Sequence, residues 1–163
     1  MAIYKPSDEY TYTSNNLSVF LAGTIDNGSS IDWQKEAEEE LQFINSRLGT
    51  GEIDIFNPRN DKWDFEIEQT VKNPEFKHQL QWEYDRLSNA DLILMNFLSG
   101  SKSPITLLEL GLFADTGKII IVCPEEFWRR GNVEFVSDMY GIPRFDTLRE
   151  AMGHIADIID SEY

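Results

Sequence analysis

The sequence predicts an α/β fold: a doubly wound, mainly parallel sheet of five strands, or four, with helices on both faces. Short apolar runs alternate along the chain with longer segments that repeat apolar residues at helical spacing. The runs contain too few polar residues to face water on either side, which is typical of strands buried in a parallel sheet. These two observations favour the Rossmann/flavodoxin-like class.

The apolar runs and the helical periodicities define the predicted elements. The predicted strands are 17–25, 52–58, 91–98 and 118–124. The predicted helices are 32–49, 76–90, 104–116 and 147–160, with a short helix broken at Pro74 within 61–75. Residues 1–17 are predicted to form an N-terminal arm, or an edge segment with a strand at 10–13, and 18–163 a single α/β domain.

Composition narrows the function classes. The chain has 163 residues, of which 29 are acidic and 14 basic, so its formal net charge is −15. A surface with this much negative charge repels nucleic acid polymers. It does not exclude a local site for one small nucleoside. One cysteine, Cys123, permits no internal disulfide, and we find neither a leader peptide nor a membrane span. We therefore expect a soluble cytoplasmic protein without membrane or polymeric nucleic acid partners.

The predicted topology also indicates where a ligand would bind. In open parallel sheets ligands collect outside the C-terminal ends of the strands. The segments that follow the predicted strands there are 23–27, 57–61, 96–103 and 123–132.

Glu109 is the first candidate for chemistry. It stands in the predicted helix 104–116, whose other residues are almost all apolar, so we expect this helix to be buried all round. An isolated buried carboxylate is costly unless it is paired, protonated or facing a cavity. Three interpretations of Glu109 follow: its side chain reaches the surface, it is a structural hydrogen-bond acceptor, or it is a functional carboxylate.

Glu83 is the second candidate, in the preceding helix. Phe76, Leu80, Glu83, Leu87 and Ala90 share one helical stripe, so Glu83 is predicted to point inward. The alternative is a partly buried glutamate paired with an arginine. Two inward carboxylates on neighbouring helices suit glycosidic chemistry, where one attacks the anomeric carbon and the other handles a proton.

Several segments resemble the nucleoside 2-deoxyribosyltransferase-like family from about residue 18 to the end. They are FLAGTID (20–26), NPRND (57–61), WEYDRLSNADLIL (82–94), SPITLLELGLFADTGKIIIVC (103–123) and GNVEF (131–135). The resemblance implies that Glu109 is the nucleophile of a covalent deoxyribosyl intermediate. It implies that Glu83, eight residues before Asp91, assists at the base and sugar.

The resemblance also implies further binding residues and a shared site. Gly23, Thr24 and Asp26 correspond to the glycine-containing turn beside the ligand. Asn132 matches an asparagine that family members supply to the active site of a neighbouring subunit. A homo-oligomer, a dimer or higher, is expected on this ground.

Two departures from the family pattern point in opposite directions. Many transferases have an aspartate six residues before the nucleophile, where this chain has Ser103, as the related deoxynucleoside 5′-monophosphate N-glycosidases do. Those hydrolases use an arginine two residues after the turn serine, where this chain has Asp26, which would repel a phosphate. Ser103 at a helix N-terminus could bind either an anion or a sugar hydroxyl.

The remaining candidates are weaker. Arg59 follows the second predicted strand and could stack on a base, pair with Glu83 or lie in a solvated turn. No Cys/His/Asp cluster has metal-ligand spacing and no dinucleotide or phosphate-loop fingerprint occurs, so we expect no metal and no cofactor.

The sequence thus favours an enzyme that transfers deoxyribose between a deoxynucleoside and a free nucleobase. The alternatives are an N-glycosidase that acts on a deoxynucleoside or its 5′-monophosphate and a non-catalytic nucleoside- or nucleotide-binding module.

Overall fold

The computed structural model describes residues 1–12, 16–25, 30–47, 52–60 and 66–162. They contain one sheet, of six parallel strands, with the order β1-β3-β2-β4-β5-β6. The strands are β1 (Ala2–Tyr4), β2 (Asn16–Gly23), β3 (Glu52–Phe56), β4 (Leu92–Asn96), β5 (Ile119–Val122) and β6 (Arg144–Phe145). The doubly wound parallel α/β class is confirmed.

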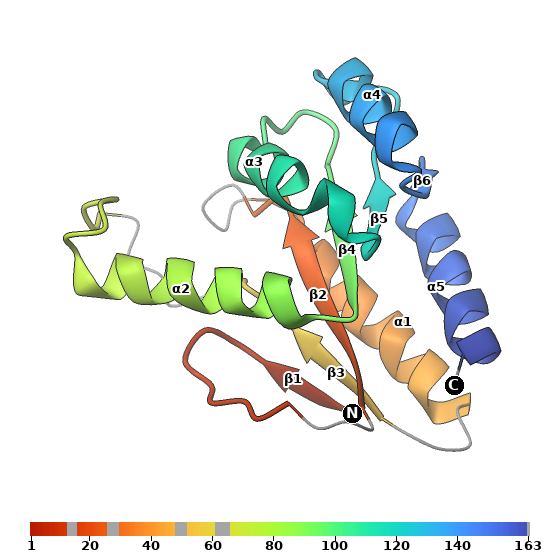
Figure 1. The fold of residues 1–163 in the computed structure, drawn as a ribbon, viewed down its shortest axis with the longest axis horizontal. Coiled ribbons are helices and arrows are strands. Elements are labelled where there is room, and N and C mark those ends of the chain that lie inside the picture. The colour runs from red at the N-terminus through yellow and green to blue at the C-terminus, as the bar shows by residue number, and fades with distance from the viewer. Residues whose placement is uncertain (13–15, 26–29, 48–51, 61–65, 163) are drawn as a thin grey trace.

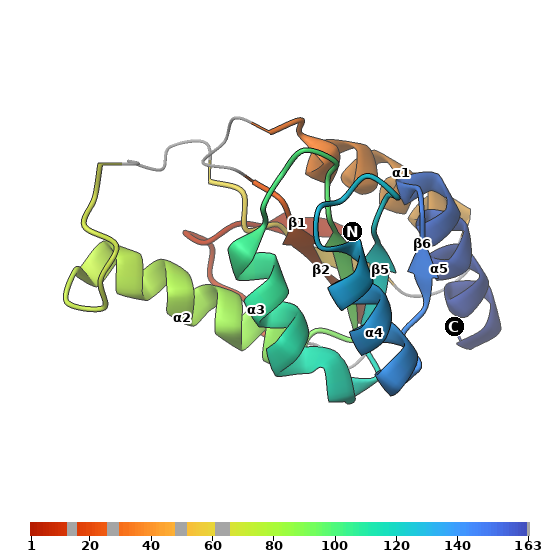
Figure 2. The same cartoon turned by 90° about the horizontal axis from the view of Figure 1, so that it is seen from above.

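In the described part of the chain, five α-helices cover the two faces of this sheet. They are α1 (Trp33–Arg47), α2 (Pro74–Asn89), α3 (Pro104–Phe113), α4 (Arg130–Tyr140) and α5 (Leu148–Glu162). Helices α1 and α5 pack on one face, and α2, α3 and α4 on the other (Figures 1 and 2). Each face therefore has its own apolar core, which explains why the central strands are buried on both sides.

Several predicted elements differ from the observed ones. The sheet has two more strands than the apolar runs predicted, and the edge strand is Ala2–Tyr4 rather than 10–13. Helix α4 was not predicted. Pro74 does not break a helix but begins α2, where the Asn73 side chain accepts hydrogen bonds from the backbone N–H groups of Glu75 and Phe76.

The expectation that helix 104–116 is buried all round is wrong. Helix α3 exposes Ile105, Leu108 and Leu112, each with 58–59% of its surface accessible. The helix ends at Phe113 and continues as one 3₁₀ turn, Ala114–Thr116. Its apolar outer face is thus unpartnered within the described part of this chain.

The N-terminal segment is fastened to α2. The Arg86 guanidinium of α2 lies 5.2–5.7 Å from four ring centroids, those of Tyr10, Tyr12, Phe56 and Trp82. Arg86 also donates a hydrogen bond to the Tyr12 hydroxyl at 3.2 Å. These contacts join the N-terminal segment and β3 to the helix that carries Glu83, which lies across one face of the sheet (Figure 1).

The strand order places a switch point between β2 and β4. From β2 the chain proceeds to β3 on one side, and from β4 to β5 on the other. The two strands end together, with Gly23 paired in register with Asn96. Gly23 has φ +147°, and an added Cβ would overlap the Asn96 carbonyl oxygen and lie 2.8 Å from the Trp33 ring. Only glycine fits at this junction.

We predict that Gly23→Ala destabilises the protein by roughly 2 kcal/mol, because the methyl group forces β2 and β4 apart. Equilibrium urea unfolding measures the change. Gly153→Ala is the matched control, since nothing lies within 4 Å of its Cβ in α5, and it should leave stability unchanged or raise it by up to about 1 kcal/mol. Equal stability of Gly23→Ala and wild type would contradict the proposed steric constraint.

Candidate active site

A cavity of about 490 Å³ lies at the C-terminal edge of the sheet, beside the β2–β4 switch point. Its walls come from the end of β2, the loop after β3, and helices α2 and α3. The apolar part of the wall contains Phe20, Ala22, Ile25, Pro58, Phe76, Leu80 and Ile105. A cavity of this size and mixed character suits a ligand as large as a nucleoside.

Five of the eight predicted site residues line this one cavity. They are Gly23, Thr24, Glu83, Ser103 and Glu109. They come from the end of β2 and the residue after it, from α2, and from the first two turns of α3 with its N-cap. The fold thus brings together residues that are up to 86 positions apart in the sequence. Asp26 lies outside the described residues, and Arg59 and Asn132 lie elsewhere.

Glu109 reaches the cavity from the inner side of α3. Thr106, three residues earlier, lies on the same side of the helix and also lines the cavity. Glu109 is only partly exposed, and within the described part of the chain its carboxylate accepts no hydrogen bond. The Glu109 carboxylate on this apolar helix thus faces the cavity and not the outer surface of the protein.

Glu83 faces the same cavity from α2. Gln79, one turn earlier, donates a hydrogen bond from Nε2 to Glu83 Oε1 at 2.6 Å and lies 3.3 Å from the Pro58 carbonyl oxygen. Gln79 therefore fixes the orientation of Glu83 relative to the loop after β3. Gln79 was not predicted from the sequence. The signal for it is its spacing of four residues from Glu83, which places both polar side chains on the inward side of the helix.

The two carboxyl groups have raised pKa values. Burial raises the pKa of Glu109 to about 8, and the negative charge of Glu83 adds to the shift. Burial also raises the pKa of Glu83, whereas the hydrogen bond from Gln79 lowers it by a smaller amount. Two like charges in one cavity disfavour double ionisation, so the pair retains a proton near neutral pH.

Ser103 is held in an unusual backbone conformation. It precedes Pro104 as the N-cap of α3, with φ 44° and ψ 51°, and its side chain makes no cap hydrogen bond. Its hydroxyl turns inward to Thr24 at 2.6 Å and to Ser101 at 2.8 Å. This left-handed conformation is strained for a non-glycine residue and persists because the surrounding hydrogen bonds hold it.

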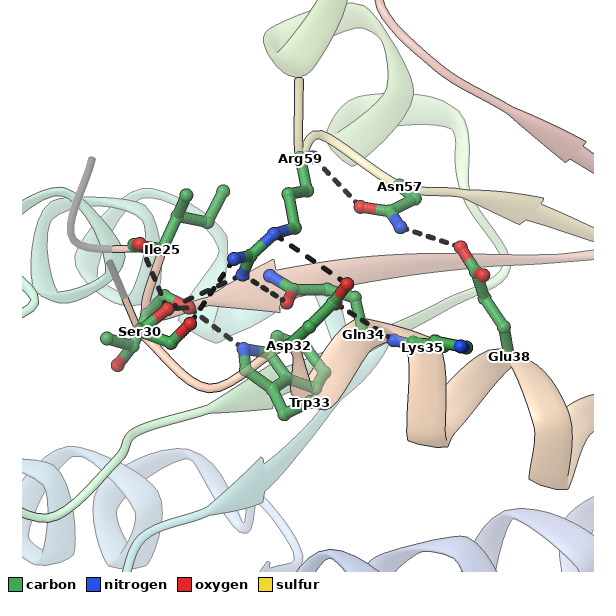
Figure 3. Close-up of polar contacts among 10 residues, drawn as sticks. Ile25, Ser30, Asp32, Trp33, Gln34, Lys35, Glu38, Asn57 and Arg59 are labelled. Carbon is green, nitrogen blue, oxygen red and sulfur yellow. Dashed lines mark hydrogen bonds and ion pairs between the residues drawn. The ribbon is translucent and has the colours of Figure 1, made fainter. Parts of the chain in front are cut away.

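Arg59 supports the loop between β2 and α1 and does not contribute to the cavity wall. It is 7% exposed and donates hydrogen bonds to the Ser30 carbonyl at 3.2 Å and to Gln34 Oε1 at 3.4 Å. Its Nε lies 3.9 Å from a carboxylate oxygen of Asp32. Figure 3 shows the guanidinium directed at Ser30 and Asp32 before α1 and at Gln34 in its first turn. A contact of Arg59 with a ligand remains a prediction.

Asn132 lies on the opposite side of α3 from Glu109. It is exposed on α4 and borders a shallow depression with Leu107, Leu110, Trp128 and Val136. Within this chain the depression and the cavity are lined by different residues of α3. Asn132 is therefore not one of the residues that line the carboxylate cavity of its own subunit.

Asp91, just before β4, has a structural contact with β2. It accepts hydrogen bonds from the backbone and hydroxyl of Ser18 at 2.8 and 2.7 Å. Among the described residues no group of His, Cys, Asp or Glu could hold a metal ion. Nor does any helix there have the length and apolar character needed to cross a membrane.

We predict that Glu109→Gln stabilises the protein increasingly as pH rises. The raised pKa means that the native state binds the Glu109 proton more tightly than the unfolded chain, so wild-type stability falls between pH 4.5 and pH 8. The glutamine does not titrate, and its advantage should grow by roughly 2 kcal/mol across this range. Urea unfolding at several pH values measures it.

Glu125→Gln, at an exposed position, is the matched control and should show no such trend. A pH-independent difference between Glu109→Gln and wild type would contradict the raised pKa.

Comparison with one solved structure supports the fold. A conserved protein from Enterococcus faecalis V583 aligns with a TM-score of 0.54 at 8% sequence identity, over 91% of this chain and 99% of that one. A CMP N-glycosidase from Clostridium botulinum aligns with a TM-score of 0.46 at 19% identity, over 85% and 97% of the two chains. No curated protein matches the sequence.

The family is shown by the sequence itself. The family model described as "Nucleoside 2-deoxyribosyltransferase like" matches residues 16–127, which is more than half of the 163 residues. This range contains β2 to β5 and the lining residues of the cavity. The chain therefore belongs to the nucleoside 2-deoxyribosyltransferase-like family, whose members act on N-glycosidic bonds.

Proposed function

We propose that the protein cleaves the N-glycosidic bond of 2′-deoxynucleosides and transfers the deoxyribosyl group to another nucleobase through a covalent intermediate on Glu109. The observation that carries this proposal is the pair of carboxyl groups, Glu83 and Glu109, at one cavity of nucleoside size. The apolar wall around Phe20 and Phe76 provides a surface on which a base can lie.

In the first step a carboxylate oxygen of Glu109 attacks C1′ while the bond from C1′ to the base nitrogen breaks. The base leaves with the electron pair of that bond and receives a proton from Glu83. Before a nucleoside binds, the raised pKa of Glu109 keeps the shared proton on Glu109 near neutral pH, so this step requires that the proton passes to Glu83 and that Glu109 is ionised when the nucleoside is bound. Gln79 holds Glu83 in the required orientation.

In the second step a nitrogen of the acceptor base attacks C1′ and Glu109 departs as a carboxylate. The proton of the acceptor base returns to Glu83, so the enzyme is restored with its atoms and charges unchanged. If water attacks instead, free deoxyribose forms and the same site is a hydrolase.

The transfer reaction is tested by incubating the protein with a 2′-deoxynucleoside and a different free base. We expect a new deoxynucleoside, detected by liquid chromatography with mass detection. Free deoxyribose without new nucleoside would show the hydrolase alternative. Tight binding without any conversion, unchanged in Glu109→Ala, would show the non-catalytic module.

The covalent step predicts that Glu109→Gln lowers kcat by about 10³-fold or more, because an amide oxygen is a poor nucleophile. Incubation of wild type with a 2′-fluoro-2′-deoxynucleoside should give an adduct on Glu109, identified by intact mass and peptide mapping. Glu125→Gln should retain full activity, as its side chain is exposed away from the cavity wall. An adduct on another residue would refute the assignment of Glu109.

The functional unit in this proposal is a homo-oligomer that buries the exposed apolar side chains of α3 and α4. Six large apolar residues on these helices and in the loop before α4 are 53–65% exposed: Ile105, Leu108, Leu112, Trp128, Phe135 and Met139. Ile105 also lines the cavity, so a second subunit on this surface would adjoin the cavity mouth. Asn132 on α4 would then be available to a neighbour's active site.

We predict that Leu108→Arg dissociates the oligomer and lowers specific activity, because a buried interface does not accept an unpaired guanidinium. Sedimentation velocity measures the mass, and wild-type specific activity should fall on dilution. Phe43→Arg, at a 61%-exposed apolar residue on α1, is the control that should change neither. A monomeric and fully active wild type would refute the shared site.

A further inference from the structure

Three hydroxyl groups meet at the cavity wall where the loops after β2 and β4 touch. Thr24 Oγ1 lies 2.6 Å from Ser103 Oγ and 3.0 Å from Ser101 Oγ, and the two serine hydroxyls are 2.8 Å apart. All three residues are buried, with 1–7% of their surface exposed. Thr24 and Ser103 line the cavity, and Ser101 stands behind them.

The backbone of Leu98 fixes the direction of the hydrogen bonds in this cluster. The Leu98 N–H donates to Thr24 Oγ1 at 3.1 Å, and the Leu98 carbonyl accepts from Ser101 Oγ at 2.9 Å. Because a carbonyl only accepts, the 2.9 Å contact between Ser101 Oγ and the Leu98 carbonyl is a hydrogen bond only when the Ser101 proton points to Leu98, and we assign it there.

Only two protons remain for the three contacts among the hydroxyls. The assignment that fills the two shorter contacts is Thr24 to Ser103 at 2.6 Å and Ser103 to Ser101 at 2.8 Å. The longest contact, from Thr24 to Ser101, then has no proton. A direct donation from Thr24 to Ser101 would instead leave one of the two shorter contacts unfilled. The cluster is thus a chain that begins and ends on Leu98 and uses every proton once.

A ligand in the cavity consequently meets lone pairs and not hydroxyl protons. Each hydroxyl donates once and accepts once within the chain, which leaves one acceptor site on Thr24 and one on Ser103. A ligand hydroxyl can donate to either without disturbing the chain. A phosphate has no proton to donate when fully ionised, so it can be bound here only if an internal hydrogen bond breaks.

The rest of the described cavity wall offers a phosphate no compensation. Its charged side chains are the two acids, Glu83 and Glu109, and no lysine or arginine among the described residues lines it. Lys102 is exposed beside Ser103 but is not part of the wall. Pro104 removes one backbone N–H from the first turn of α3, which weakens that helix end as an anion site.

We propose that Ser101 is a specificity-determining residue: by directing its proton to Leu98 it makes the hydroxyl cluster an acceptor, so the site takes the uncharged deoxynucleoside and rejects its 5′-monophosphate. This inference rests on the proposed function and excludes one of its alternative substrates. Ser101 acts through Thr24 and Ser103 and has no contact with the cavity itself.

The first test compares kcat/KM for base release from a 2′-deoxynucleoside and from its 5′-monophosphate. We expect the wild-type kcat/KM to be about 100-fold higher for the nucleoside, because binding the monophosphate breaks a buried hydrogen bond beside two acids. A preference for the monophosphate, or equal rates, would overturn the inference while leaving the proposed chemistry intact.

The second test is Ser101→Ala, which removes the terminal acceptor of the chain and frees one hydroxyl proton for the ligand. The turn itself is retained, because the Ser101 N–H donates to the Leu98 carbonyl at 3.2 Å. We expect the ratio of the two kcat/KM values to fall by about tenfold. Ser99→Ala, at an exposed serine of the same loop, is the matched control and should keep the wild-type ratio.

The ratio separates specificity from general damage. A Ser101→Ala variant that loses activity equally on both compounds keeps its ratio, and that result would refute the role of Ser101. If wild type cleaved neither compound, the proposed function would fail. Calorimetric titration with the same intact compounds would then decide the inference: tighter binding of the nucleoside supports it, and equal or tighter binding of the monophosphate refutes it.

Discussion

The close approach of β2 and β4 is the constraint on which the site depends. At Gly23 and Asn96 the two strands end in register, and the Thr24 N–H continues the ladder by donating to the Asn96 carbonyl at 3.0 Å. A side chain at position 23 would collide with β4 and with Trp33. Because the strands meet this closely, the loops that follow them come into hydrogen-bonding contact.

That contact sets the start and direction of α3. Thr24 holds Ser103 through a 2.6 Å hydrogen bond, and Ser103 in its left-handed conformation is followed at once by Pro104 and the first turn of the helix. Glu109 lies less than two turns further on, facing the cavity. A glycine at the end of one strand therefore determines where a carboxylate on a distant helix is placed.

The sequence was sufficient for the central strands and for the two carboxylates, because both produce local patterns. Apolar runs identified β2 to β5, and a charge interrupting an apolar stripe identified Glu83 and Glu109. The strands β1 and β6 have three and two residues, too few for any periodicity. Helix α4 was missed because the segment that opens it was assigned to the ligand edge.

Other features depend on tertiary contacts that no local pattern encodes. Arg59 follows β3 at the ligand edge, as predicted, yet its side chain turns to Ser30 and Gln34, since those partners satisfy a buried guanidinium. The hydroxyl cluster joins residues 77 and 79 positions apart. The hydrophobicity of α3 predicted burial, yet its outer face is exposed in this chain, and the proposed oligomer would cover it.

The electrostatics of the cavity connect the proposed substrate with the proposed chemistry. Glycosidic cleavage passes through an oxocarbenium-like transition state, in which positive charge develops on the sugar ring. Glu83 and Glu109, with no cation among the described lining residues, form a wall that stabilises such a charge more than the neutral ground state. A phosphate on the sugar would oppose this effect, since its negative charge would lie beside the same carboxylates and raise their pKa values further. Among the described lining residues the absence of a basic side chain thus has two consequences. This part of the wall is unfavourable for an anionic ligand, and it suits a neutral ligand that becomes cationic as its bond breaks.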